Sequence, residues 1–195
     1  MAQTGPLTKN TSQLALGMAQ IRVGPSIANI GTVAVALTSG QSIGAVASTR
    51  LTLTREYYKH EAGFPLLEDA QIPIRENAQL EAAFEEINAY NMMLTAGKDP
   101  VDSASGQIEL GALASPTYLR MEAHYTFPGG TGMFIVFPRT QILSNTEIDF
   151  QKEENAKVPL TFKAQRADGL VSGGSAVWNA MPLGRVYFSG GTPGN

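Results

Sequence analysis

The dominant pattern along the chain is an alternation of apolar and polar residues, which is typical of half-buried β-strands. Residues 157–166 show it clearly, because Leu160 and Phe162 fall on one face while Thr161 and Lys163 fall on the other. The predicted strands are residues 18–23, 30–37, 49–58, 118–127, 132–138, 141–150, 157–166 and 184–188. The pattern therefore predicts a mainly β protein.

Residues 72–96 carry two competing patterns. A helical stripe is formed by Leu80, Phe84, Ile87, Asn91 and Leu94. A strand face is formed by Ile72, Ile74, Ala78, Leu80, Ala82 and Phe84. Local propensity favours one long helix from about Glu76. A helix that starts only at 88, with Asn88 as N-cap and Gly97 just past its end, is equally well indicated. The residues alone leave both alternatives open.

The composition limits the class of protein. A length of 195 residues fits one large domain, and the absence of cysteine removes thiol nucleophiles and zinc–thiolate sites. Charged residues make up 16% of the chain, against about 25% in a typical domain. A surface so poor in charge is often buried against copies of itself. The net charge of −3 argues against a basic face that binds nucleic acid.

The two ends differ from the middle in composition. Residues 1–17 are predicted to form an N-terminal arm, and residues 171–195 a Gly/Ser-rich C-terminal extension, on either side of one domain at 18–170. We expect no secretory leader in the polar N-terminus and no membrane span. The densest apolar run in the uncharged stretch, residues 27–37, is eleven residues long, whereas a spanning helix needs about 20.

Catalytic signatures are weak throughout. The two histidines are His60 and His124, and position 64, where a metalloprotease helix would repeat the histidine of His60-Glu61, holds Phe64. His124 is expected to be a surface or interface residue. Acidic clusters at 81–86 and 147–154 could serve glycoside hydrolysis, but the chain has one Trp to line a cleft. We therefore predict no catalytic, cofactor-binding or metal-binding residues, and no enzyme.

Seven runs occur in order along the chain: residues 21–24 (IRVG), 30–31 (IG), 54–65 (TREYYKHEAGFP), 72–76 (IPIRE), 80–88 (LEAAFEEIN), 91–97 (NMMLTAG) and 154–164 (ENAKVPLTFKA). Together they resemble the major tail tube proteins of long-tailed, siphovirus-like bacteriophages. The similarity extends over about residues 18–166 in the order of that family's elements. No single motif among these runs is diagnostic, since the family shares pattern more than letters.

The resemblance implies a β-sandwich or β-barrel with one short flanking helix at about 88–96, and a strand at 72–87. It also implies hexameric rings that stack into a hollow tube through which DNA is ejected without specific binding. In such a ring, strands of adjacent subunits would join into one continuous inner barrel, which satisfies the sheet edges. The implied partners are further copies of the chain and other tail proteins (terminator, tape measure and distal tail). The implied location is the virion tail, assembled in the host cytoplasm.

Two sets of residues are predicted to act in such a tube. Carboxylates that repel the DNA backbone would face the lumen, the candidates being Glu81, Glu85, Glu147 and Asp149. A projecting loop at 50–71 would grip the next ring, through Arg55, Tyr57, Tyr58, His60, Phe64 and Pro65. The competing hypotheses are a secretion-system tube ring, a capsid decoration or fibre-type module, and a glycan-acting enzyme.

Overall fold

The computed structural model describes residues 20–62, 67–100, 106–108, 117–127, 131–142 and 157–189. Its strands are β1 (Gln20–Pro25), β2 (Val46–Ala62), β3 (Leu67–Phe84), β4 (Leu119–Thr126), β5 (Gly132–Ile142), β6 (Val158–Ala164) and β7 (Arg185–Phe188). Its α-helices are α1 (Ser26–Asn29) and α2 (Ala89–Thr95), and two 3-10 turns lie at Ser39–Gln41 and Ala176–Trp178. The prediction of a mainly β fold with one short flanking helix is confirmed.

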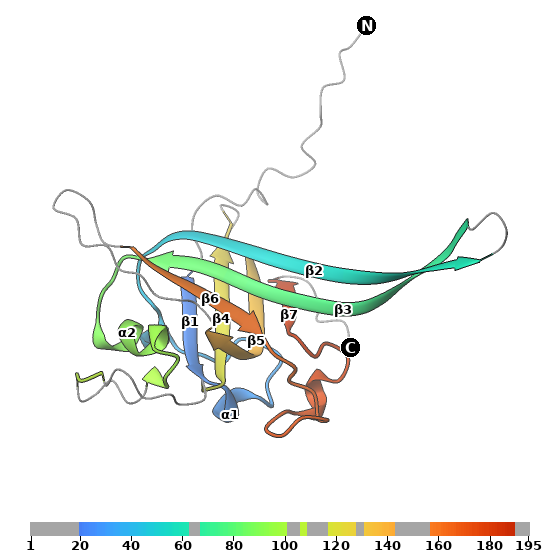
Figure 1. Cartoon of the computed structure of the whole chain (residues 1–195). Helices are drawn as coiled ribbons and strands as arrows, with labels where there is room; N and C mark the ends of the chain where they lie inside the picture. Colours follow the sequence, from blue (N-terminus) through green and yellow to red (C-terminus); the bar gives the residue numbers. More distant parts are fainter. Residues whose placement is uncertain are drawn as a thin grey trace, which may run out of the picture.

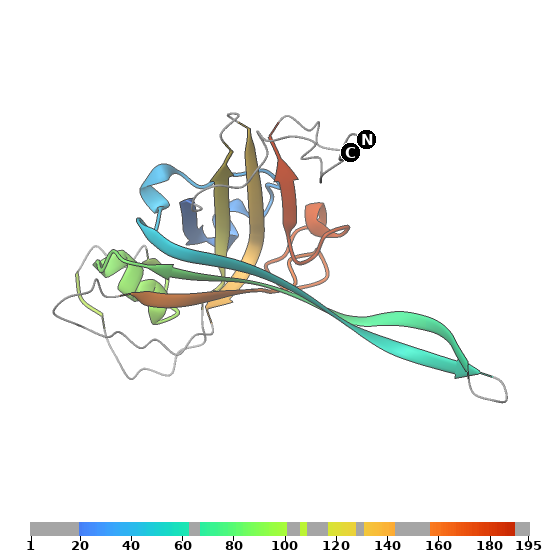
Figure 2. The same ribbon diagram turned by 90° about the horizontal axis from the view of Figure 1, so that it is seen from above.

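All seven strands of the described residues belong to one antiparallel sheet of order β1-β4-β5-β6-β3-β2, with β7 also paired to β5. The sheet folds into two layers, one made by β2, β3 and β6 and the other by β1, β4, β5 and β7 (Figure 1, Figure 2). Strand β5 joins the layers, because its first half pairs with β7 and its last three residues pair with β6. The N–H of Ile43 donates to the carbonyl of Ile21, which brings the lead-in to β2 onto the edge of β1.

The core lies between the two layers. In β6 the burial alternates as the sequence predicted, since Val158, Leu160, Phe162 and Ala164 are buried. Their partners across the layers include Ile21, Val23, Leu119, Met121, Ala123, Ile135 and Phe137. This apolar interior fixes which face of β2, β3 and β6 points away from the body, and that outward face is the polar one.

The ambiguity at 72–96 is resolved in favour of a long strand followed by a short helix. Strand β3 buries Ala78, Leu80, Ala82 and Phe84 against the core, and over this part it pairs with both β2 and β6. The N–H of Asn91 donates to the side chain of Asn88, which is therefore the N-cap of α2. Gly97 has a φ of 68°, the left-handed conformation that ends such helices. The alternative of one long helix from about Glu76 is wrong. Pairing of β3 with β2 on one edge and with β6 on the other outweighs the local helix propensity of these residues.

Two other strand predictions need correction. Residues 30–37 form no strand, and they lie instead over the outer face of β4. The predicted break between 132–138 and 141–150 is also wrong, because β5 runs continuously to Ile142. Pro138 fits within β5 because the register shifts between Leu119 and Met121 on the neighbouring strand. The rest of the second predicted strand, residues 143–150, lies outside the described residues.

The C-terminal region differs from the expected extension. Strand β7 pairs with β5 over four residues, from Arg185 opposite Val136 to Phe188 opposite Met133. Trp178 is completely buried, and its indole N–H donates to the carbonyl of Ile30 at 2.6 Å. Residues 171–189 therefore belong to the body of the domain, whereas the predicted N-terminal arm at 1–17 lies outside the described residues.

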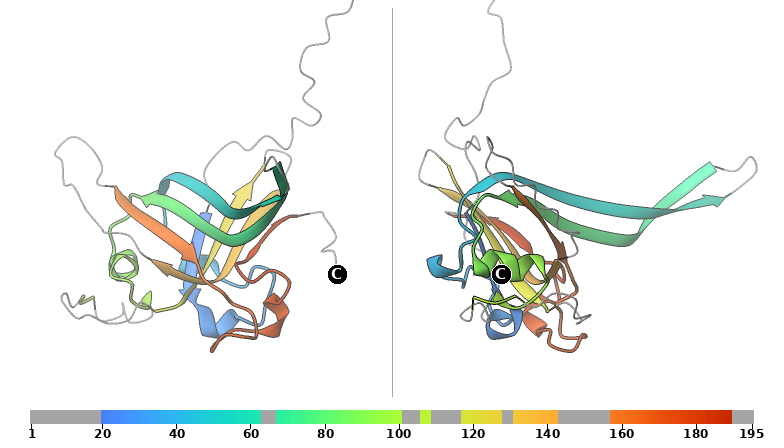
Figure 3. Two further views of the ribbon diagram at one scale, coloured as in Figure 1. Left: turned by 45° about the vertical axis from the view of Figure 1, so that its right-hand side comes forward. Right: turned by 60° about the vertical axis from the view of Figure 1, so that its left-hand side comes forward.

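The most prominent feature of the shape is a β-hairpin formed by β2 and β3, which extends far beyond the other strands (Figure 1, Figure 3). Strand β6 pairs with β3 only from Phe84 to Gln79. The two hairpin strands continue together from there to the pair of Ala62 and Leu67. The predicted loop at 50–71 is therefore mostly a two-stranded hairpin. It projects, as expected, but it does so as paired strands.

Candidate functional site

Two exposed ion pairs link β2 and β3 beyond the point where the hairpin leaves the body. Arg55 Nη2 lies 2.9 Å from Glu76 Oε1, and Arg75 Nη1 lies 3.4 Å from Glu56 Oε2. The hydrogen bond to Glu76 raises the pKa of the Arg55 guanidinium above its ordinary value. Exposed pairs of this kind contribute little to stability. These two pairs compensate the charges of four side chains of the hairpin, whereas its exposed apolar side chains remain uncovered.

Large apolar side chains are exposed along the hairpin. Tyr58 lies opposite Ile72, and Tyr57 lies opposite Pro73. Leu53 and Ile74 are the most exposed of the set, at 62% and 65%. A two-stranded ribbon has no third element to cover such residues. Several large exposed apolar groups gathered on one ribbon indicate an interaction surface.

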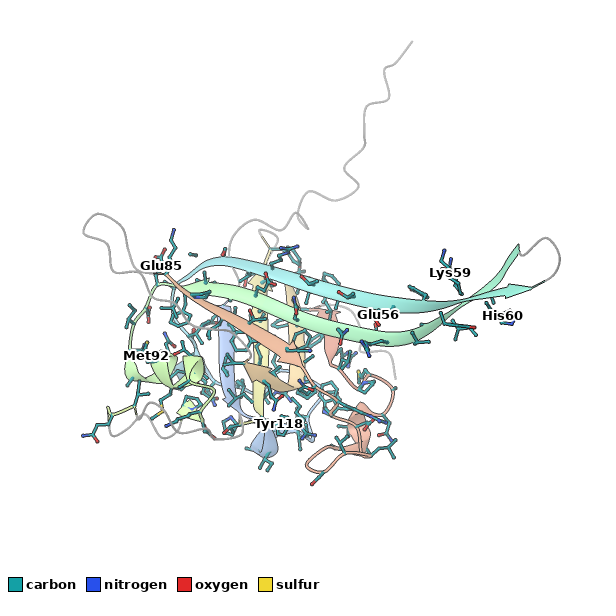
Figure 4. All side chains as sticks on the ribbon, in the orientation of Figure 1. Glu56, Lys59, His60, Glu85, Met92 and Tyr118 are labelled. Atoms are coloured by element: carbon teal, nitrogen blue, oxygen red, sulfur yellow. The ribbon has the colours of Figure 1, made fainter. Side chains whose placement is uncertain are left out.

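The structure brings together those predicted contact residues that it describes. Arg55, Tyr57, Tyr58 and His60 all lie on β2 within the projecting hairpin, and His60 is labelled near its far end in Figure 4. Phe64 and Pro65 lie outside the described residues. Leu53, Ile72 and Ile74 are exposed although they belong to alternating patterns. Alternating apolar residues normally indicate a core face, so their sequence does not predict this exposure.

The outward face of β2, β3 and β6 is polar. Glu81 lies on it between Arg50 of β2 and Thr161 of β6, and it accepts a hydrogen bond from Gln79 Nε2. Lys163 is paired with Gln79 on the same face. Basic and acidic groups are therefore interspersed here, so the face is polar and mixed in charge where the prediction expected carboxylates.

Glu85, the other predicted lumen residue that the structure describes, does not share this position with Glu81. Glu85 follows the end of β3, where its N–H donates to the carbonyl of Ala45, and Figure 4 labels it at the end of the molecule away from the hairpin tip. Glu147 and Asp149 lie outside the described residues. The structure thus places one candidate carboxylate on the polar sheet face and one beyond it.

A buried charge network occupies the outer face of β4. Arg120 Nε lies 2.7 Å from Glu122 Oε1, and both side chains are fully buried. The guanidinium also donates to the backbone carbonyls of Asn29, Thr32 and Ala34. The carboxylate accepts from the N–H groups of Ala36 and Leu37. The network therefore ties residues 29–37 to the sheet, although this segment forms no strand.

Histidine 124 adjoins this network. Its Nε2 lies 3.6 Å from Glu122 Oε2, and its ring meets Phe134 edge-on at 5.1 Å. The side chain is 12% exposed, so His124 is mostly covered within the chain and is not a surface residue, whereas its place at an interface stays a prediction. Burial by itself raises the pKa of Glu122. His124, the N–H groups of Ala36 and Leu37, and Arg120 together outweigh burial and lower that pKa to about 2.

Two surface grooves are found among the described residues. The larger, of about 620 Å³, lies beside α1 and includes Tyr118, with the Arg139 guanidinium 3.6 Å from the centre of its ring. The smaller, of about 270 Å³, lies between the root of the hairpin and residues 180–186. In the part of the chain that the structure describes, no group of three acidic or histidine side chains could hold a metal ion. No helix among the same residues is long and apolar enough to cross a membrane.

Comparisons with known proteins add no family. No model of a protein family matches the chain, and no curated protein matches it significantly. The observations that bear on function are therefore the projecting hairpin, the polar sheet face and the residues that carry the resemblance.

Proposed function

We propose that the chain is the structural subunit of a phage tail tube, which assembles into stacked rings around a lumen for DNA. The observation that carries this proposal is the long hairpin of β2 and β3, which leaves the body with its apolar side chains uncovered. A monomer gains nothing from exposing Tyr58, Ile72 and Ile74 on a ribbon. A second subunit that covers them gains roughly 25 cal/mol for each Å² of apolar surface removed from water.

The polar sheet face supports the same proposal. A wall that lets DNA slide must avoid a continuous basic stripe, since phosphates bind to Lys and Arg with release of counterions. On the outward face of β2, β3 and β6, Glu81 lies between Arg50 and Thr161, and Lys163 is paired with Gln79. The neighbouring positions on this face are uncharged, and they are held by Ser48, Thr52, Ala83 and Pro159. In the proposed tube this face lines the lumen. Glu81 is the carboxylate best placed to contribute there.

Free strand edges also fit a subunit that is completed by its neighbours. Strand β2 is 17 residues long, and among the described residues it pairs only with β3. An edge of this length in a protein that works alone is normally blunted or covered. Joining edges in a ring satisfies the unpaired N–H and C=O groups without a dedicated cover.

The test is assembly of the purified chain, viewed by negative-stain electron microscopy. The wild type is expected to give tubes or stacked rings. A variant in which residues 55–76 are replaced by Asn-Gly joins the paired residues Thr54 and Asn77 by a favourable two-residue turn. That variant should keep the fold and give no tubes. A persistent monomer from wild-type protein at high concentration would contradict the proposal.

The control keeps the hairpin and changes only its charge. Glu56→Gln with Arg75→Gln removes one exposed ion pair and leaves every apolar side chain in place. Tubes from this control, and none from the shortened hairpin, assign assembly to the projection. Trimers in place of rings would favour a decoration or fibre-type module.

A further inference from the structure

The groove at the hairpin root, called here the root groove, is largely apolar. Leu53 and Ala78 form one wall, at the point where the hairpin leaves the body. The opposite wall and floor are formed by Phe137, Ala180, Met181, Pro182, Leu183, Gly184 and Val186. Its rim is exposed as well, since Leu53 and Val186 are accessible at 62% and 43%. The surface has the size and chemistry to bury two or three apolar side chains.

The root groove also carries an uncompensated positive charge. Glu76 and Arg185 both line it. Glu76 is already paired with Arg55. Arg185 has no carboxylate within ion-pair distance among the described residues, and its guanidinium lies 5.4 Å from the ring centre of Tyr187. The groove therefore favours an occupant that is apolar and acidic.

A strand edge lies beside the groove. In the described part of the chain β7 pairs only with β5, and Arg185 and Val186 of β7 contribute to the groove wall. Backbone N–H and C=O groups on the other edge of β7 are therefore available to an extended segment. Such an edge accepts a strand or a hairpin more readily than a helix.

One segment of this chain has the matching chemistry. Residues 61–69, from the last two residues of β2 to the first three of β3, read EAGFPLLED. Phe64, Pro65, Leu66 and Leu67 are flanked there by Glu61 on one side and by Glu68 and Asp69 on the other. The segment is thus apolar in the middle and acidic at both ends, which complements an apolar groove with a free guanidinium.

The same molecule cannot place this segment in its own groove. Ala78 lies eleven residues further along β3 than Leu67, which corresponds to roughly 36 Å of extended strand. The hairpin points away from the body over that length (Figure 1). We propose that the root groove receives segment 61–69 of a second copy of the chain, in a head-to-tail contact.

This inference rests on the proposed tube and names the surface that the hairpin grips. Tip and groove lie on different parts of one chain, so the contact is heterologous, and repetition builds an open filament. The axial step between contacting copies is then at most roughly 36 Å, the length of hairpin between the two. Arg185 sets the register by pairing with the carboxylates at 68–69.

Introduced cysteines test the contact directly, because the chain has none of its own. Glu68→Cys combined with Ala180→Cys, oxidised after assembly, should give a ladder of covalent oligomers on a non-reducing gel. The matched control, Glu68→Cys with Lys157→Cys, uses an exposed position outside the groove and should give no ladder. Tubes that form from the first pair but show no ladder would overturn the inference while leaving the tube itself intact.

Charge reversal supplies an independent arm. Arg185→Glu, and separately Glu68→Arg with Asp69→Arg, should each raise the concentration needed for assembly about tenfold. The combined variant should recover most of the loss. Assembly of Arg185→Glu at the wild-type concentration would overturn the proposal. Arg139→Glu changes the larger groove beside α1, and loss of assembly in this variant alone would also overturn it. Thermal unfolding of each variant confirms that the fold is retained, and absence of tubes in the wild type would instead reject the proposed function.

Discussion

The guanidinium of Arg120 and the carboxylate of Glu122 form an ion pair of 2.7 Å in which both side chains are fully buried. Both residues project from the same face of β4, and the backbone of residues 29–37 closes over them. Burying two charges is costly, and the cost is offset here because most of their hydrogen-bonding groups have partners. The pair thereby fixes a segment that has no sheet hydrogen bonds of its own.

Removing one partner of this pair should destabilise the fold strongly. Arg120→Met leaves the carboxylate of Glu122 buried without its cation and frees three backbone carbonyls. We expect a loss of about 3–5 kcal/mol in the free energy of unfolding, measured by urea titration. The double variant Arg120→Met with Glu122→Leu should recover part of it, because no buried charge then remains. A loss below about 1 kcal/mol for the single variant would show that the pair is dispensable.

The same carboxylate predicts sensitivity to acid. The pKa of Glu122 is about 2 in the folded state, below the ordinary value of 4.5. Stability from this group is therefore fully present above about pH 4.5 and is lost as pH falls toward 2. The shift corresponds to a contribution on the order of 3 kcal/mol. Unfolding curves between pH 6 and pH 2 should show this slope, and Glu122→Gln should flatten it while lowering stability at neutral pH.

Trp178 should be essential for holding the C-terminal region against the body. It packs with Val136 and Ala167, and its N–H donates to the carbonyl of Ile30. Trp178→Ala should cost about 3–5 kcal/mol, because it creates a cavity and removes that hydrogen bond. Trp178→Phe keeps most of the volume and should cost less. Limited proteolysis between β6 and β7 is expected to follow the same order, and equal protection in the three proteins would contradict this account.

Replacing the apolar hairpin residues should separate assembly from folding. The quadruple variant Tyr57→Ser, Tyr58→Ser, Ile72→Ser and Ile74→Ser changes side chains that are about half exposed or more. Exposed substitutions of this kind usually alter stability by about 0.5 kcal/mol or less each. We therefore expect a nearly unchanged melting curve and a loss of tubes. Tubes at wild-type concentration would rule out this surface as the contact.

Much of the body could be predicted because its residues obey a local rule. The alternation in 157–166 and 118–127 reappears as β6 and β4, and the apolar segment 184–188 reappears as β7. Asn88 and Gly97 mark the ends of α2, since a cap depends on neighbours within a few residues. The resemblance in sequence favoured the long strand before α2, and β3 follows it to Phe84.

The remaining features depend on contacts between distant residues. Periodicity could not show that Leu53 and Ile74 are exposed, because exposure depends on β6 ending its pairing at Gln79. The ion pair of Arg120 and Glu122 is invisible in the sequence, since an alternating strand presents its charged face to water unless another segment covers it. Residues 29–37 provide that cover.

By itself the sequence determined a mainly β chain without cysteine, and it indicated the caps of a helix at 88–97 as one of two alternatives. Only the tertiary structure decided between those alternatives. It also decided that the predicted loop is a projecting hairpin, that the C-terminal region is part of the body and that a groove lined by Arg185 lies at the hairpin root. The physical reason is the range of the interactions. Capping and alternation act between near neighbours, whereas burial depends on which distant segments come to lie on the same face.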